Sequence, residues 1–86
     1  MTRRLKVVYT KKYLSTQEEI NGKAIYQFLC EDDTITVGDI ITSNKYNTPI
    51  QVIEIFNDAN TKVNGIILST ISIASIQRGP NYNPGE

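Results

Sequence analysis

The sequence predicts a small all-β domain: a five-stranded barrel or rolled sheet with an extended N-terminal strand and an extended C-terminal tail. Thirteen of the 86 residues are Ile, five are Val and nine are Thr, against four Leu and three Ala. Branching at Cβ disfavours helix and suits a pleated surface. Five short apolar runs, separated by turn signals about 8–12 residues apart, are typical of a small barrel. The length fits one domain, residues 1–76, followed by a tail of residues 77–86.

The first strand begins at Leu5 and is expected to extend toward Leu14. Side chains alternate between the two faces of a strand, so one face carries the apolar residues Leu5, Val7, Tyr9 and Tyr13. The opposite face carries a polar and mainly basic set: Arg4, Lys6, Thr10 and Lys12. Lys11 interrupts the apolar face, which predicts a bulge or the end of the strand near it.

The next segment has the start signal of a short helix. Ser15 with Glu18, or Thr16 with Glu19, has capping-box spacing, and Asn21-Gly22 ends the segment. We expect one helical turn at most, or a loop.

The second strand is predicted over residues 23–30. Its apolar residues fall on both faces, which is typical of a central strand. A polar turn follows at residues 31–34, and Gly38-Asp39 is expected to form a tight turn that leads into a third strand at Ile40. A loop then runs from Ser43 to Pro49.

The last two strands are predicted over residues 50–56 and 66–76. In each the apolar pattern changes phase, between Val52 and Ile53 in the first and near Ala74 in the second. In the first strand the change predicts a strong twist or a bulge, and in the second it predicts a bend from one sheet to another. Asn64-Gly65 has the composition of a type I′ hairpin turn.

The middle of the chain, residues 24–56, resembles small SH3-like barrels, including KOW-type modules. The resemblance rests on three short motifs: Tyr26-x-Phe28, Val37-Gly38-Asp39-x-Ile41 and Val52-Ile53-x-Ile55. KOW modules carry a glycine before the fourth strand, where this chain has Asn47-Thr48-Pro49. The resemblance therefore implies the fold, and it does not imply an RNA-binding or ribosomal role. Many short phage and mobile-element proteins share this pattern.

The composition argues against enzymatic chemistry and against any cofactor. The chain has no His, so imidazole cannot serve as a general base or metal ligand, and its single Cys cannot form an internal disulfide. Cys30 shares a strand face with Phe28 and Tyr26, so we expect it to be a core residue. The carboxylates of residues 31–33 and Asp39 could hold a hard cation, but their spacing favours a solvated turn.

The charges are balanced overall, nine basic and nine acidic, but they are segregated along the chain. Residues 1–23 have a net charge of +4, residues 24–61 of −5 and residues 62–86 of +1. The basic first strand is compatible with a charged edge strand, with an acidic protein partner, or with nucleic-acid phosphates. Its candidate partner-binding residues are Arg3, Arg4, Lys6, Lys11, Lys12 and Tyr13.

The tail is predicted to form neither helix nor interior strand, because Gly and Pro recur in it. Its candidate partner-binding residues are Arg78, Pro80, Tyr82 and Pro84, with Tyr82 as the expected anchor.

These features together predict a non-enzymatic protein-binding module, an accessory component of a phage particle or similar large assembly, such as an auxiliary capsid protein. Its expected partners are capsid or other virion proteins. The alternative is a small phage or mobile-element regulator that binds nucleic acid or inhibits a host protein. No apolar run approaches a membrane span and the first residues lack the pattern of a signal peptide, so we expect the virion or the host cytoplasm as its location.

Overall fold

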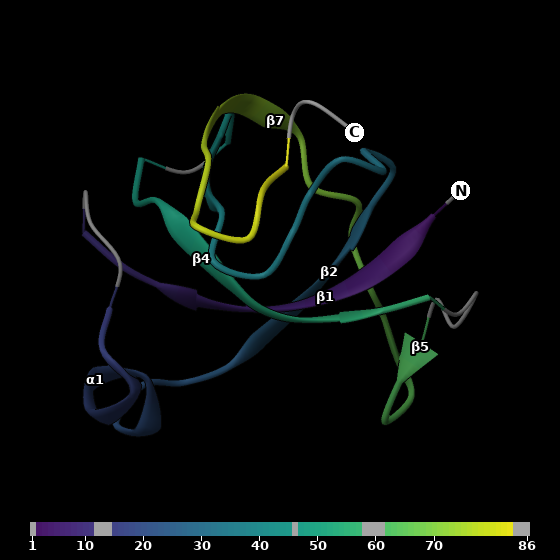
Figure 1. The fold of residues 1–86 in the computed structure, drawn as a ribbon. Coiled ribbons are helices and arrows are strands. Elements are labelled where there is room, and N and C mark those ends of the chain that lie inside the picture. Colours follow the sequence, from purple (N-terminus) through teal and green to yellow (C-terminus); the bar gives the residue numbers. More distant parts are fainter. Residues whose placement is uncertain (1, 12–14, 46, 58–61, 84–86) are drawn as a thin grey trace.

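The chain folds into a small all-β structure with one short helix, as the composition predicts (Figure 1). The computed structural model describes residues 2–11, 15–45, 47–57 and 62–83. The elements in chain order are β1 (Arg3–Tyr9), α1 (Gln17–Asn21), β2 (Tyr26–Cys30), β3 (Ile40–Ser43), β4 (Ile50–Phe56), β5 (Lys62–Val63), β6 (Ile66–Ile67) and β7 (Ile73–Gln77).

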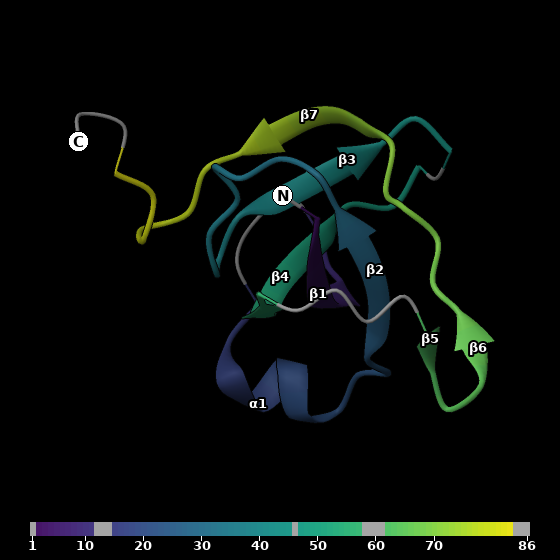
Figure 2. The ribbon, with the colours of Figure 1, turned by 90° about the vertical axis from the view of Figure 1, so that its right-hand side faces the viewer.

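Five of the strands form one antiparallel sheet in the order β2-β1-β4-β3-β7, and β5 and β6 form a separate hairpin. The segment just before β7 also reaches the opposite end of the sheet. There the N–H of Leu29 donates to the carbonyl of Ser69 (2.9 Å), and the N–H of Ile71 donates to the carbonyl of Leu29 (2.8 Å). One stretch of chain thus contacts both ends of the sheet, which curls around the core (Figure 2).

The core lies on the inner face of this curled sheet. Leu5 and Val7 of β1, Val52 of β4 and Ile41 of β3 are fully buried there. Burying a large aliphatic side chain stabilises the folded state by about 1.5–3 kcal/mol. The packing of these side chains on the inner face is therefore the main contribution that holds the three strands together. Cys30 belongs to the same cluster, which confirms that it is a core residue.

Both phase changes in the sequence are bulges. Opposite β1, the register passes from Lys6–Glu54 to Val7–Val52, which leaves Ile53 as the extra residue of β4. Opposite β3, it passes from Thr42–Ser75 to Ser43–Ile73, which leaves Ala74 as the extra residue of β7. A bulge shifts the alternation of side chains by one position, so it reverses which residues face the core.

The order of the strands differs from two expectations. The basic strand β1 lies between β2 and β4, so it is not an edge strand. Conversely β2, predicted to be central, lies at one end of the sheet, and its first residue, Tyr26, is solvent-exposed. Ile25 and Tyr26 are exposed, so these apolar residues do not form the buried second face that a central strand would have.

Element boundaries also differ from expectation. β1 ends at Tyr9, whereas the prediction extended it toward Leu14; residues 12–14 lie outside the described part of the chain. The predicted fifth strand is divided into β6 and β7, and Gln77, assigned to the tail, is the last residue of β7. The turn at Asn64-Gly65 has positive φ at both residues (52° and 80°), as a type I′ hairpin requires.

The helix signal is confirmed, with Thr16 and Glu19 as the capping pair. The N–H of Glu19 donates to the Thr16 hydroxyl, and the N–H of Thr16 donates to the Glu19 carboxylate. The hydrogen bond that the Glu19 carboxylate accepts from the Thr16 N–H lowers the pKa of Glu19. Gly22 ends the helix after five residues.

The position of the core can be tested with two identical substitutions. Ile41 is fully buried and Ile67 is 70% exposed. We expect Ile41→Ala to lower the free energy of unfolding by about 2–5 kcal/mol and Ile67→Ala to change it by less than about 0.5 kcal/mol. Urea unfolding followed by circular dichroism measures both. Equal effects of the two substitutions would contradict the assignment of the core.

Candidate functional site

After β7 the chain folds back across the turn that precedes β3 (Figure 1). We call residues 78–83 the strap and residues 34–39 the receptor turn. The strap contains three of the predicted partner-binding residues, and it donates hydrogen bonds to Thr34, Val37 and Asp39 of the receptor turn.

The receptor turn is built so that it buries a carboxylate. Gly38 has a φ of 99°, a conformation that residues with a Cβ rarely adopt, and its N–H donates to the Val52 carbonyl (2.8 Å). The N–H of Val52 in turn donates to the Asp39 carbonyl (3.0 Å). These bonds fix the turn on β4, and the side chain of Asp39 is 0% exposed.

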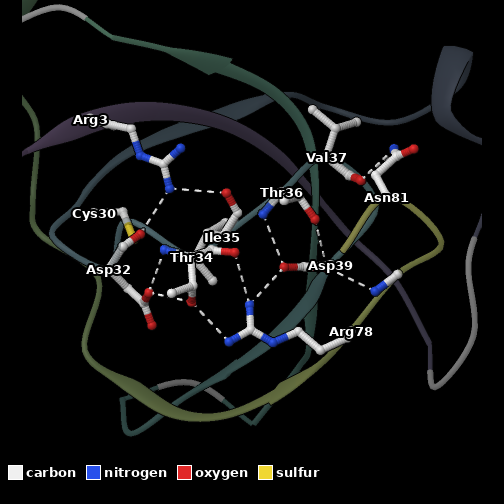
Figure 3. Close-up of polar contacts among 11 residues, drawn as sticks. Arg3, Cys30, Asp32, Thr34, Ile35, Thr36, Val37, Asp39, Arg78 and Asn81 are labelled. Atoms are coloured by element: carbon white, nitrogen blue, oxygen red, sulfur yellow. Dashed lines mark hydrogen bonds and ion pairs between the residues drawn. The ribbon is translucent and has the colours of Figure 1, made fainter. Parts of the chain in front are cut away.

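Both oxygens of the buried carboxylate accept hydrogen bonds (Figure 3). Thr36 donates its backbone N–H to Oδ2 (3.0 Å) and its hydroxyl to Oδ1 (3.1 Å). From the strap, Arg78 Nη1 donates to Oδ2 (3.2 Å) and the Gly79 N–H donates to Oδ1 (2.8 Å). A buried charge is tolerated only when it is paired and hydrogen-bonded, so the strap supplies what the receptor turn lacks.

The guanidinium of Arg78 is held on more than one side. It donates to the backbone carbonyl of Thr34 (3.1 Å) and to the Thr34 hydroxyl (2.9 Å), and its central carbon lies 4.0 Å from the ring centroid of Tyr82. Thr34 is itself fixed, because its N–H and hydroxyl both donate to Asp32 Oδ1. Those two bonds hold the pKa of Asp32 below its usual value.

Close packing excludes a side chain at Gly79. A Cβ at this position would lie 2.5 Å from the carbonyl oxygen of Gly38, which is a backbone atom. Further along the strap, Asn81 Nδ2 donates to the Val37 carbonyl (2.9 Å), and the Tyr82 N–H donates to the Gly79 carbonyl (3.3 Å). The strap therefore has a fixed backbone path across the receptor turn.

The other side of this loop is held by the first strand. Arg3 Nη2 donates to the carbonyls of Asp32 (2.8 Å) and Ile35 (3.0 Å) (Figure 3). Burial raises the pKa of the nearby Cys30 thiol, which keeps this group protonated and unreactive. Arg3, predicted to bind a partner, thus supports the loop that carries the receptor turn.

The structure separates the remaining predicted residues. Arg4 and Lys6 lie over the ring of Phe56 at 4.0 and 5.4 Å, and Lys6 also pairs with Glu54 at 3.7 Å. Lys11 is exposed beyond the end of β1. Lys12, Tyr13 and Pro84 lie outside the described residues.

Two residues central to the site were not predicted to belong to it. Asp39 was assigned to a solvated acidic turn; it is instead fully buried, because Gly38 turns its carboxylate toward the strap. For Gly79 the sequence predicts only the absence of helix and interior strand. One feature of the sequence could have indicated the burial of Asp39: it is a single charged residue between Val37 and the apolar pair Ile40-Ile41. Among the described residues, no three His, Cys, Asp or Glu side chains form a group that could hold a metal ion.

Two other surface features lie away from the strap. The β5–β6 hairpin exposes Ile66 and Ile67, on the opposite side of the molecule from the strap (Figure 2). A concave surface of about 340 Å³ is lined by Tyr9, Lys23, Ala24 and Tyr26. The described part of the chain contains no helix with the length and apolar character of a membrane span.

No protein-family model, curated protein or solved structure matches the chain. The assignment of a functional site therefore depends on the geometry of this molecule.

The importance of the Asp39–Arg78 pair can be measured against an exposed pair. Removing one partner of a buried pair costs about 3–5 kcal/mol, and we expect about 3 kcal/mol for Arg78→Ala, because this side chain is 30% exposed. Lys6→Ala, which removes the solvated pair with Glu54, should cost less than about 1 kcal/mol. Urea unfolding of both variants tests this, and a similar small cost for each would refute a structural role of the buried pair.

Proposed function

We propose that this chain is a non-enzymatic protein-binding module, an accessory component of a phage particle or similar large assembly, and that the strap is its docking surface. The observation that carries the proposal is the attachment of the strap to a fully buried carboxylate. This attachment gives an irregular segment one backbone path, and a preorganised surface loses less conformational entropy when it binds.

The residues on the outer side of the strap suit protein recognition. Pro80 and Asn81 are exposed, and Val37 of the receptor turn is 39% exposed beside them. Tyr82 is half-buried, with its ring against the guanidinium of Arg78. Tyr and Arg are enriched among the residues that dominate binding energy, and both are immobilised here before any partner arrives.

The size and charge of the chain support a role within an assembly. A domain of 86 residues with no net charge has little long-range electrostatic attraction to a polyanion as a whole. Its recognition then depends on local contacts, of the kind that the strap offers.

Replacing the aromatic anchor tests this proposal. In lysates of cells that naturally produce the chain, we expect it to sediment with particles much larger than its own 9.7 kDa. Tyr82→Ala should reduce the fraction that sediments with them by about tenfold, the loss expected for a central interface residue. The matched control is Tyr26→Ala, which removes an exposed tyrosine far from the strap in sequence and should leave sedimentation unchanged.

The outcome can also contradict the proposal. If all of the chain sediments as a free small protein, or if Tyr82→Ala and Tyr26→Ala behave alike, the strap is not the docking surface.

A second candidate function, nucleic-acid binding, is favoured by one observation. Arg4 and Lys6 both lie over the ring of Phe56 on the outer face of β1, and basic and aromatic side chains together suit single-stranded nucleic acid. The neighbouring carboxylate of Glu54 opposes this, because it already pairs with Lys6.

Salt dependence distinguishes the two functions. Phosphate binding weakens steeply with ionic strength, so a nucleic-acid-binding chain should bind a labelled single-stranded oligonucleotide at ~50 mM salt and release it on addition of salt. We expect no binding at ~50 mM salt, measured by fluorescence anisotropy. Binding that Lys6→Ala weakens would favour the second function instead.

A further inference from the structure

The inner side of the strap, which contacts the receptor turn, supports a further proposal. This proposal does not depend on whether the outer side of the strap binds a partner. The receptor turn contacts the strap through groups that distinguish one short sequence from others. The sequence Arg78-Gly79-Pro80-Asn81 contains the only Arg-Gly pair in the chain. We propose that the receptor turn is a recognition site for this Arg-Gly-Pro-Asn segment, and that it accepts the segment from a second copy of the chain as well as from its own.

The first position of the segment requires arginine. Asp39 Oδ2, the Thr34 carbonyl and the Thr34 hydroxyl accept hydrogen bonds from two nitrogens of one guanidinium. The planar guanidinium can satisfy acceptors on two of its edges at once, whereas a lysine ammonium is a compact point charge. The carboxylate is 0% exposed, so a cation is needed there.

The second position requires glycine. Its N–H must approach Asp39 Oδ1 to 2.8 Å, and at this distance a Cβ would be only 2.5 Å from the Gly38 carbonyl oxygen. The obstacle is backbone, held on β4 by the bond from the Gly38 N–H to Val52, so it cannot rotate away as a side chain would. At the fourth position, the bond from Asn81 Nδ2 to the Val37 carbonyl extends the recognition beyond the Arg-Gly pair.

The receptor turn is held in shape by residues outside the strap. Thr36 donates two hydrogen bonds to Asp39, Asp32 holds Thr34, and Arg3 donates to the carbonyls of Asp32 and Ile35. A receptor turn that loses its own strap therefore keeps its acceptors in place, with a carboxylate that lacks the cation and the N–H supplied by the strap. Such a site favours rebinding of an Arg-Gly segment from any chain that offers one.

Exchange of the strap between copies replaces each hydrogen bond with an identical one. In dilute solution a chain's own strap prevails, because its effective concentration is in the range of about millimolar for a short linkage. Where copies are crowded, or where a chain's own strap cannot bind, the strap of a neighbour takes its place. Exchange of identical elements is a known route by which a monomer forms dimers or longer assemblies.

A peptide binding experiment tests the recognition directly. In Gly79→Ala the strap cannot fit, while the receptor turn is unchanged. We expect a fluorescent peptide of the strap, residues 78–83, to bind this variant at least about tenfold more tightly, by anisotropy, than the same peptide with Arg78→Lys or with Gly79→Ala. It should bind the native chain far more weakly, because the native strap occupies the site. Equal binding of the three peptides, or no binding to folded Gly79→Ala, would overturn the proposal.

A mixing experiment tests exchange between full chains, and it remains informative if Gly79→Ala folds poorly. Asp39→Ala keeps a complete strap but lacks the receptor carboxylate, and Gly79→Ala has the reverse defect. When they are mixed, the strap of the first should bind the receptor turn of the second, giving a species of twice the mass by light scattering and restoring any lost β-sheet signal in circular dichroism. Absence of both changes at concentrations where the native peptide binds would show that recognition does not extend to neighbouring copies.

If the peptide and mixing experiments give negative results, the outer surface of the strap can still dock on a partner. If Tyr82→Ala leaves sedimentation unchanged, the docking proposal is wrong, but the receptor turn can still recognise the Arg-Gly segment. The two proposals are therefore separable.

Discussion

The carboxylate of Asp39 is the constraint on which much of this structure depends. A charge with no exposed surface must be neutralised and hydrogen-bonded, and its donors come from three residues: Thr36 in the same turn, and Arg78 and Gly79 beyond the last strand. The need of this carboxylate for donors brings together two segments about 40 residues apart in the chain. An irregular segment rich in Gly, Pro and Asn thereby acquires a single conformation, and both proposals, outer docking surface and inner recognition site, follow from it.

The segregation of charge along the sequence has a related explanation. The basic first strand and the acidic middle region contact each other within the fold: Lys6 pairs with Glu54 on the surface, and Arg3 donates to the backbone carbonyls of Asp32 and Ile35. Arg78 meets Asp39 in the same way. The charges that are segregated along the sequence are thus partly used for contacts within the chain, because β1 lies in the middle of the sheet.

Features that depend on neighbouring residues were predictable from the sequence. The bulge at Ile53, the capping pair Thr16 and Glu19, and the turn at Asn64-Gly65 all follow from local patterns. The pattern near Ala74 located an irregularity, which is a bulge where a bend was expected. The order of the strands and the burial of Asp39 were not predictable, because each depends on a partner distant in the sequence. An aspartate in a turn is usually solvated, and only the Arg78-Gly79 pair, folded back across that turn, makes its burial favourable.

Amide hydrogen exchange at Gly79 tests the central claim most directly. If its N–H is bound to the buried carboxylate, opening of the strap should be rare, and protection should come within about tenfold of that of the buried Ile41 amide in β3. Gly65, in the exposed turn of the β5–β6 hairpin, supplies the reference for an amide without such burial. Exchange of the Gly79 amide as fast as that of Gly65 would show that the strap is not held by Asp39, and it would contradict the account.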